Sequence, residues 1–135
     1  SESGGGSLYD HLVAKDLLTV SKEDLLPTAE ASAGVELVAA ADVLIYFGNL
    51  APLFAAMSSL STASAVLAVS AELVHEQQSP QGWSLLRSGR FAHTKEYVVE
   101  MASRAGGFDL VQYEEQSPRT EYGKPLAGHL FVFAR

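Results

Sequence analysis

The sequence predicts an α/β domain whose sheet is mostly parallel and closes in an antiparallel C-terminal hairpin. Two β-favouring runs, 35–47 and 65–69, are apolar on both faces, which is typical of strands covered by helices on both sides. They alternate with helix-like segments, and this alternation favours a parallel sheet. The last two apolar runs, 108–114 and 128–134, have no helix between them, so we expect them to pair antiparallel.

The N-terminal region contains only short sequence patterns. Residues 1–7 are rich in Gly and Ser, which predicts a flexible segment ahead of one domain at 8–135. Residues 12–14 form a short apolar run, a candidate strand that ends at Asp16. Residues 21–26 look like a helical turn that begins at Ser21 and stops at a proline.

Two longer helices are expected further on. Residues 50–60 follow a Gly-Asn break and carry Pro52 near the first turn, where proline is tolerated. Residues 94–105 place apolar side chains on one face at a 3.6-residue period, and two glycines end the helix. Residues 75–89, between the second strand and this helix, are polar and are expected to form a loop.

Composition excludes several classes of protein. Of the 135 residues, 47% are hydrophobic and 19% are charged, which predicts a packed core rather than disorder. The net charge is −7 and the nine basic residues are scattered, so no nucleic-acid partner is expected. There is no cysteine, which excludes disulfides and Cys-ligated zinc, and the four histidines lack metal-ligand spacing, so no metal site is assigned.

Residues 37–57 are apolar enough to require a check for a membrane span. They contain Asp42, and Gly48, Asn49 and Pro52 interrupt them, while no basic cluster flanks them. We therefore expect no membrane span. Because no signal peptide is apparent, the expected location is the cytoplasm or an organellar lumen or matrix, and not the outside of the cell.

Four segments, in order, resemble one protein family. They are 40–50 (AADVLIYFGNL), 69–72 (VSAE), 88–94 (SGRFAHT) and 119–128 (RTEYGKPLAG). The chain resembles the C-terminal part of class I S-adenosylmethionine-dependent methyltransferases, in particular those often fused to tetratricopeptide repeats. The resemblance implies a Rossmann-like fold, and it covers the chain from strand three onward.

The resemblance also defines what this chain lacks. The family's first strand and its Gly-rich motif I have no counterpart, nor has the acidic residue that binds the ribose. In addition, Ser61-Thr62-Ala63 stands where the family usually has a Pro-Gly turn. The implied strand order of 3-2-1-4-5-7-6 would leave the strand 35–47 as an open edge. Open edges associate, so we expect it to be covered by a missing N-terminal half, a second copy or another subunit.

The resemblance implies where S-adenosyl-L-methionine, the expected cofactor, would bind. Asp16 would lie near the adenine and Leu17 would pack on the ring, although an Asp here equally suits the start of a loop. Residues from Asp42 to Tyr46 would lie beside the methionine moiety and the acceptor. The alternative for Tyr46 is a core aromatic.

Three further residues are candidate catalytic groups. Glu72 leaves the second strand at the edge of the sheet where ligands bind. Arg90 and His93 come from the loop that could close over the site, and His93 is the preferred general base because histidine titrates near neutral pH. The alternative for His93 is a structural residue beside the N-cap of the next helix.

Two functions follow from these observations. The first is methyl transfer to a small-molecule or protein acceptor, with the chain alone inactive because the Gly-rich loop is missing. The second is a non-catalytic remnant that serves as a structural or interaction subunit of a larger complex. A different small α/β binding domain is a third reading, because fold does not determine function.

Overall fold

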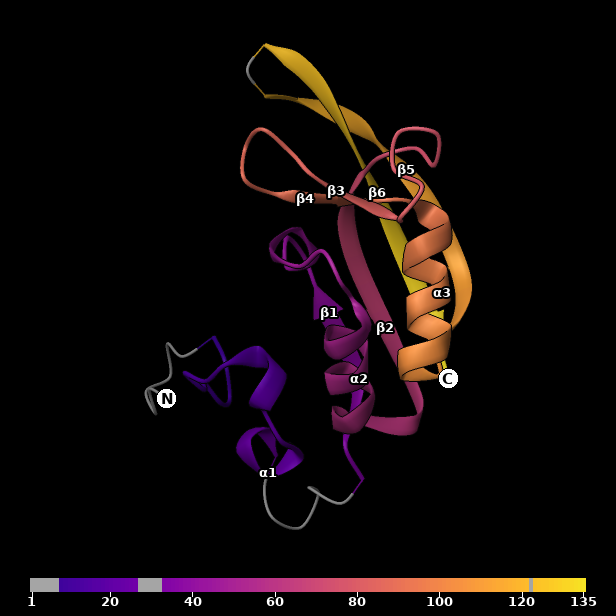
Figure 1. Ribbon diagram of the computed structural model, residues 1–135. Helices are drawn as coiled ribbons and strands as arrows, with labels where there is room; N and C mark the ends of the chain where they lie inside the picture. The colour runs from indigo at the N-terminus through magenta and orange to yellow at the C-terminus, as the bar shows by residue number, and fades with distance from the viewer. Residues whose placement is uncertain (1–7, 27–32, 122) are drawn as a thin grey trace.

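The computed structural model describes residues 8–26, 33–121 and 123–135, so the expected flexible segment 1–7 lies outside the described residues. Figure 1 shows two longer helices in front of a curled sheet. The elements, in chain order, are η1 (Leu17–Thr19), α1 (Lys22–Leu25), β1 (Val35–Ala40), η2 (Leu44–Tyr46), α2 (Ala51–Leu60), β2 (Ser61–Leu73), β3 (Trp83–Leu85), β4 (Phe91–His93), α3 (Lys95–Gly106), β5 (Asp109–Glu121) and β6 (Lys124–Ala134).

The sheet is mixed, and the expectation of a mostly parallel sheet is wrong. Its strand order is β3-β4-β2-β6-β5, and β1 also pairs with β2. β2 is parallel to β1 and to β4, whereas the pairs β2–β6, β5–β6 and β3–β4 are antiparallel. The parallel character is lost because β6 inserts between β2 and β5, and because the expected loop 75–89 contains β3.

The expected long strand at 35–47 ends early. Pairing with β2 stops at Ala40, and Asp42 takes a left-handed conformation with φ 57°. Asp tolerates this conformation better than most residues do. The chain then forms the short helix η2, in which Leu44 and Ile45 are buried. A buried turn and a buried strand have the same apolar composition, which is why the sequence pattern did not separate them.

The expected strand at 12–14 is also absent from the described residues. These residues have no strand assignment, and the side chains of Leu12 and Val13 are exposed. A strand needs a neighbour to accept its hydrogen bonds. The described part of the sheet places β1 at that side and no strand beyond it.

Both longer helices are where the sequence placed them, and local signals define their ends. Before α2, the Asn49 side chain accepts a hydrogen bond from the Ala51 N–H at 3.0 Å. Before α3, Thr94 Oγ1 accepts from the Tyr97 N–H at 3.1 Å, which satisfies a donor that the helix cannot. α3 ends at Gly107, whose φ of 71° is left-handed.

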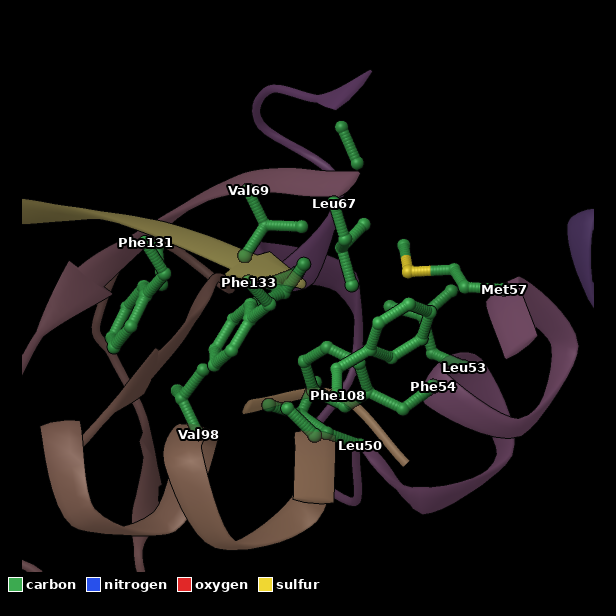
Figure 2. Packing of buried hydrophobic residues seen from close by; sticks show 14 residues of the cluster. Leu50, Leu53, Phe54, Met57, Leu67, Val69, Val98, Phe108, Phe131 and Phe133 are labelled. Atoms are coloured by element: carbon green, nitrogen blue, oxygen red, sulfur yellow. The ribbon is translucent and has the colours of Figure 1, made fainter. Parts of the chain in front are cut away.

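The core lies between one face of the sheet and the two longer helices (Figure 2). Phe133 of β6 packs edge-on against Phe54 of α2, with ring centroids 6.0 Å apart, and stacks on Phe131 at 5.7 Å. The other buried members shown come from β2, α2, α3 and the residues that flank the helices: Leu50, Leu53, Met57, Leu67, Val69, Val98 and Phe108.

The opposite face of the sheet keeps apolar side chains in solvent. Leu37 of β1 is 63% exposed and lies beside Val66 of β2, which is also exposed. Leu130 of β6, opposite Ser70, continues this surface. Among the described residues, no helix has both the length and the apolar character to cross a bilayer.

Truncation of Phe133 tests the core. Its ring is fully buried between the sheet and α2, so Phe133→Ala is expected to lower the free energy of unfolding by about 3–5 kcal/mol. Urea denaturation followed by circular dichroism measures this. The control Val111→Ala, at an exposed position of β5, is expected to cost less than about 1 kcal/mol. Equal losses in the two variants would contradict the described core.

Candidate functional site

The candidate site lies at the carboxyl ends of β1 and β2. Because these two strands are parallel, their carboxyl ends meet at one edge of the sheet, where open α/β sheets bind ligands. β4 is parallel to β2 as well and pairs with its last two residues. The edge therefore gathers the turn after β1, the exit of β2 and the end of β4. All three segments carry predicted site residues.

Glu72 and Arg90 come together as an ion pair. Arg90 Nη1 lies 3.1 Å from Glu72 Oε1; the Glu72 side chain is 7% exposed and that of Arg90 is 36% exposed. A buried carboxylate is costly without a partner, and the guanidinium stabilises its ionised form. The buried carboxylate of Glu72 is therefore held in place by Arg90, whose guanidinium is partly accessible to solvent.

His93 is fully buried, and its ring is already engaged. Nε2 lies 2.7 Å from the carbonyl oxygen of Phe47. A carbonyl only accepts, so Nε2 carries the proton of the neutral ring and donates it. Burial is the main cause that lowers the pKa of His93 to about 4, although the bonds to the Phe47 and Gly48 backbone act in the opposite direction. The ring is thus neutral near pH 7 and acts as a hydrogen-bond donor inside the protein.

His93 and the Glu72–Arg90 pair lie on opposite faces of the sheet. Side chains alternate along a strand, and Val69 and Ala71 of β2 belong to the core. Glu72 therefore faces away from the helices. His93 pairs with Leu73 in register and stacks on the ring of Tyr97 in α3. The structure brings two of the three candidate catalytic residues together and places the third on the helix side.

Asp42 and Tyr46 lie in the connection from β1 to α2. The side chain of Tyr46 is 71% exposed, so it is not a core aromatic. Asp42 is exposed, and its backbone N–H donates to Ser70 Oγ at 3.1 Å. Because Ser70 and Glu72 are two residues apart on β2, they share a face. Asp42 thus lies on the side of the site where the ion pair is found.

Asp16 and Leu17 lie at the start of η1, beside α2. Asp16 Oδ1 accepts a hydrogen bond from the Leu18 N–H at 3.0 Å, and its carbonyl accepts from Thr19. This is the loop-starting role that the sequence left open. Leu17 is exposed. A role of these two residues in binding adenine stays a prediction.

Several residues near the site were not selected from the sequence. Tyr97 lies on the apolar face of α3, yet its hydroxyl accepts a hydrogen bond from the Leu50 N–H at 3.1 Å. A second buried histidine, His129, holds the Tyr113 hydroxyl at 2.9 Å through Nδ1. The spacing of apolar residues along the sequence does not reveal such polar contacts. The four-residue spacing of His93 and Tyr97 across the start of α3 was the one signal that could have linked them.

Two cavities flank the first turn of α3, and both include Glu96. One, of about 210 Å³, lies beside Lys95, Tyr113 and His75. The other, of about 250 Å³, lies beside Gly82 and Tyr97. Neither is lined by the Glu72–Arg90 pair or by Tyr46. In the described ranges, no three His, Asp or Glu side chains are grouped so that they could hold a metal ion.

Comparison with known proteins identifies the fold. No family model matches the sequence, and no curated protein matches it either. Among solved structures, the [4+2]-cyclase SpnF superposes with a TM-score of 0.67 at 12% identity, over 91% of this chain and 54% of that one. The N-methyltransferase NodS from Bradyrhizobium japonicum, solved with S-adenosylhomocysteine, gives 0.58 at 16% identity, over 91% and 53%.

A further match is a SAM-dependent methyltransferase from Methanosarcina mazei, with a TM-score of 0.59 at 12% identity, over 76% of this chain and 60% of that one. The chain spans about half to three fifths of the length of these structures. Its fold is that of the class I S-adenosylmethionine-dependent methyltransferases, with β1, β2, β6 and β5 in the implied order 4-5-7-6. The likeness to members fused to tetratricopeptide repeats stays a prediction.

Burial of the two histidines predicts how stability depends on pH. The pKa of His129 is also lowered to about 4, mainly by burial and next by the charge of His93. Between pH 6.5 and about 4, the unfolded chain binds protons at these rings and the folded chain does not. The free energy of unfolding should therefore fall as the pH falls, by at most about 1.4 kcal/mol per pH unit for each ring.

Urea denaturation between pH 7.5 and 4.5 measures this slope. Carboxylates titrate in the same range, so the comparison between variants isolates the histidines. His93→Gln and His129→Gln are each expected to flatten the slope relative to that of the unsubstituted protein. A ring signal of His93 that titrates near pH 6.5 in the folded protein would contradict the prediction.

Proposed function

We propose that this chain is the C-terminal part of an S-adenosylmethionine-dependent methyltransferase domain, and that it binds the methionine end of the cofactor and the methyl acceptor. The observation that carries the proposal is the position of the polar groups. On a methyltransferase fold, Asp42, Tyr46, Glu72 and Arg90 gather at the carboxyl ends of two parallel strands. This is where an open α/β sheet binds its ligand.

The exposed residues after β1 fit one end of the cofactor. S-adenosylmethionine supplies an activated methyl group on a sulfonium, next to an amino acid moiety. The carboxylate of Asp42 and the exposed ring of Tyr46 are groups that attract a cation, by charge and by the negative face of the ring. In this proposal Asp42 binds the ammonium group, and Tyr46 packs beside the sulfonium and excludes water. Asp16 and Leu17 would extend the site toward the adenine.

Glu72 and Arg90 form the acceptor side. Arg90 holds the Glu72 carboxylate in place at 3.1 Å, so in this proposal Glu72 accepts a hydrogen bond from the nucleophile and orients it. Arg90 is the more exposed member and meets the acceptor first. Methyl transfer depends mainly on alignment of the nucleophile with the methyl group. A small number of fixed polar groups is therefore sufficient on this side. His93, with its ring engaged inside the protein, would support the site indirectly.

A second candidate function is interaction without catalysis, and one observation favours it. β1 is an edge strand in the described sheet, and the adjacent face exposes Leu37, Val66 and Leu130. Such a surface associates with other chains unless it is covered. We propose that the N-terminal portion of the same domain covers it. A second copy or another subunit would be the cover if the chain instead functions as a non-catalytic subunit.

Calorimetric titration of the intact gene product with S-adenosylhomocysteine tests the catalytic proposal. Binding is expected. Tyr46→Ala should weaken the binding of S-adenosylmethionine, titrated in parallel, roughly tenfold, about 1.4 kcal/mol, because the ring then loses its contact with the sulfonium, which S-adenosylhomocysteine lacks. Leu85→Ala, at another exposed apolar position, should leave the affinity unchanged. A folded protein that does not bind S-adenosylhomocysteine would favour the non-catalytic function.

Sedimentation of residues 1–135 tests the uncovered edge. This chain is expected to self-associate, since no segment among residues 8–26, 33–121 and 123–135 covers its edge strand and exposed apolar face. Leu37→Lys should shift the distribution toward monomer, because a lysine on an edge strand opposes pairing, whereas Leu85→Lys should not. If residues 1–135 sediment as a stable monomer without substitution, the proposed cover is unnecessary. A monomeric intact gene product would show that the cover is intramolecular.

A further inference from the structure

The connection from β1 to α2 is held by the segment that leads into α3. His93 Nε2–H donates to the carbonyl oxygen of Phe47 at 2.7 Å. Three residues further along the connection, the Leu50 N–H donates to the Tyr97 hydroxyl at 3.1 Å. Both ends of the turn 47–50 are thus bonded to β4 and α3, which are more than forty residues away in the sequence.

The middle of the turn is packed as tightly. Gly48 lies against Trp83 and Phe91, whose rings meet edge-to-face at 5.5 Å. A Cβ atom at position 48 would lie 3.0 Å from Trp83 Cε3 and 3.1 Å from Phe91 Cε1. Those distances are shorter than ordinary van der Waals contact. Glycine is therefore the residue that fits between the turn and these two rings.

The groups that hold the turn support one another. The rings of His93 and Tyr97 stack at 6.2 Å with an interplanar angle of 8°. Thr94 lies between them in sequence and caps α3 through the Tyr97 N–H, while its own N–H donates to the Gly82 carbonyl at 2.8 Å. A Cβ atom at Gly82 would fall 2.4 Å from the Tyr97 ring. We name His93, Tyr97, Trp83 and Phe91 the clamp.

The clamp also sets the orientation of Asn49. The Asn49 Oδ1 atom accepts from the Ala51 N–H at 3.0 Å and, over a long 3.5 Å, from the Tyr97 hydroxyl. Both donors lie on one side, which turns the amide NH2 group away from them. Asn49 is exposed, and the exposed Tyr46 lies just before the turn. The side chain of Asn49 is therefore held by these two hydrogen bonds, and the exposed Tyr46 is next to the held turn.

We propose that His93 and Tyr97 are positioning residues that hold the turn 47–50, so that Asn49 and Tyr46 present a preformed surface to the ligand. This proposal rests on the proposed function, because it assigns a ligand to the carboxyl end of β1. Asn49 is then a further binding residue, a hydrogen-bond donor beside the cation-attracting ring. A clamp of this kind lowers the cost of binding, since the turn need not be ordered by the ligand.

Hydrogen exchange in the intact gene product tests the clamp without a ligand. Tyr97→Phe removes the acceptor of the Leu50 N–H and retains the ring. Protection of the Leu50 amide is expected to fall by roughly tenfold, the factor of a single hydrogen bond. Protection of Val69, in the centre of β2, should be unchanged. Tyr113→Phe is the matched control, because it also removes a tyrosine hydroxyl that makes a hydrogen bond, in this case to His129 Nδ1; it should leave Leu50 protected.

Binding of S-adenosylhomocysteine tests what the clamp is for. His93→Leu removes the donor to Phe47 and should weaken binding by roughly tenfold. His93→Gln supplies an amide N–H at a similar reach and should restore part of the affinity. Both substitutions disturb a buried site, so a purely structural role would weaken binding equally in the two. The single tryptophan, Trp83, should report the loosened turn as a change in fluorescence.

Two results would overturn the positioning role. One is Leu50 protection that survives Tyr97→Phe, or that falls only together with Val69. The other is equal affinity in His93→Leu and His93→Gln at equal stability. If the unsubstituted protein does not bind S-adenosylhomocysteine, the proposed function fails, and the positioning of a ligand surface fails with it. The Leu50 result then still shows whether the clamp orders the turn.

Discussion

The hydrogen-bonded pairing of β2 with three other strands holds the remaining parts of the chain in place. Residues 61–69 of β2 pair with β1, residues 72 and 73 pair with β4, and β6 runs along the other edge. The same residues decide which side chains reach the site, because the alternation along β2 directs Ala71 into the core and Glu72 away from it. A shift of one residue in this register would exchange the two faces and bury the Glu72–Arg90 pair among aromatic rings.

The parts of the fold that the sequence predicted are those with repeated or local signals. The 3.6-residue period of α3 and its glycine end identified that helix, and the two C-terminal strands were placed from their composition. The turn at Asp42 and the three-residue strand at Trp83 were missed. Apolar periodicity does not distinguish a strand from a buried turn, and a short strand is stabilised by its partner rather than by its own residues.

The sequence selected several residues of the candidate site but did not predict how they are arranged. Glu72 and Arg90 were selected from a strand exit and a loop, and the structure brings them together. The side on which His93 lies could not be predicted, because it depends on the register of a three-residue strand with β2. Its burial changes the chemistry that the sequence suggested. A histidine whose pKa is lowered to about 4 is uncharged at neutral pH, and one that donates to a carbonyl has its Nε2 proton engaged.

The exposed face and the site are linked by position. Glu72 lies on the same face of β2 as Val66, and on the same face of the sheet as Leu130 of β6. The proposed cover of these apolar side chains would therefore also approach the ion pair. Removal of water would strengthen the attraction between Glu72 and Arg90 and raise the cost of leaving either one unpaired. The cover would thus bury the apolar surface and also turn a partly solvated ion pair into a fixed wall of the site. Under the proposed function, the chain alone and the covered chain should therefore differ in affinity for S-adenosylhomocysteine.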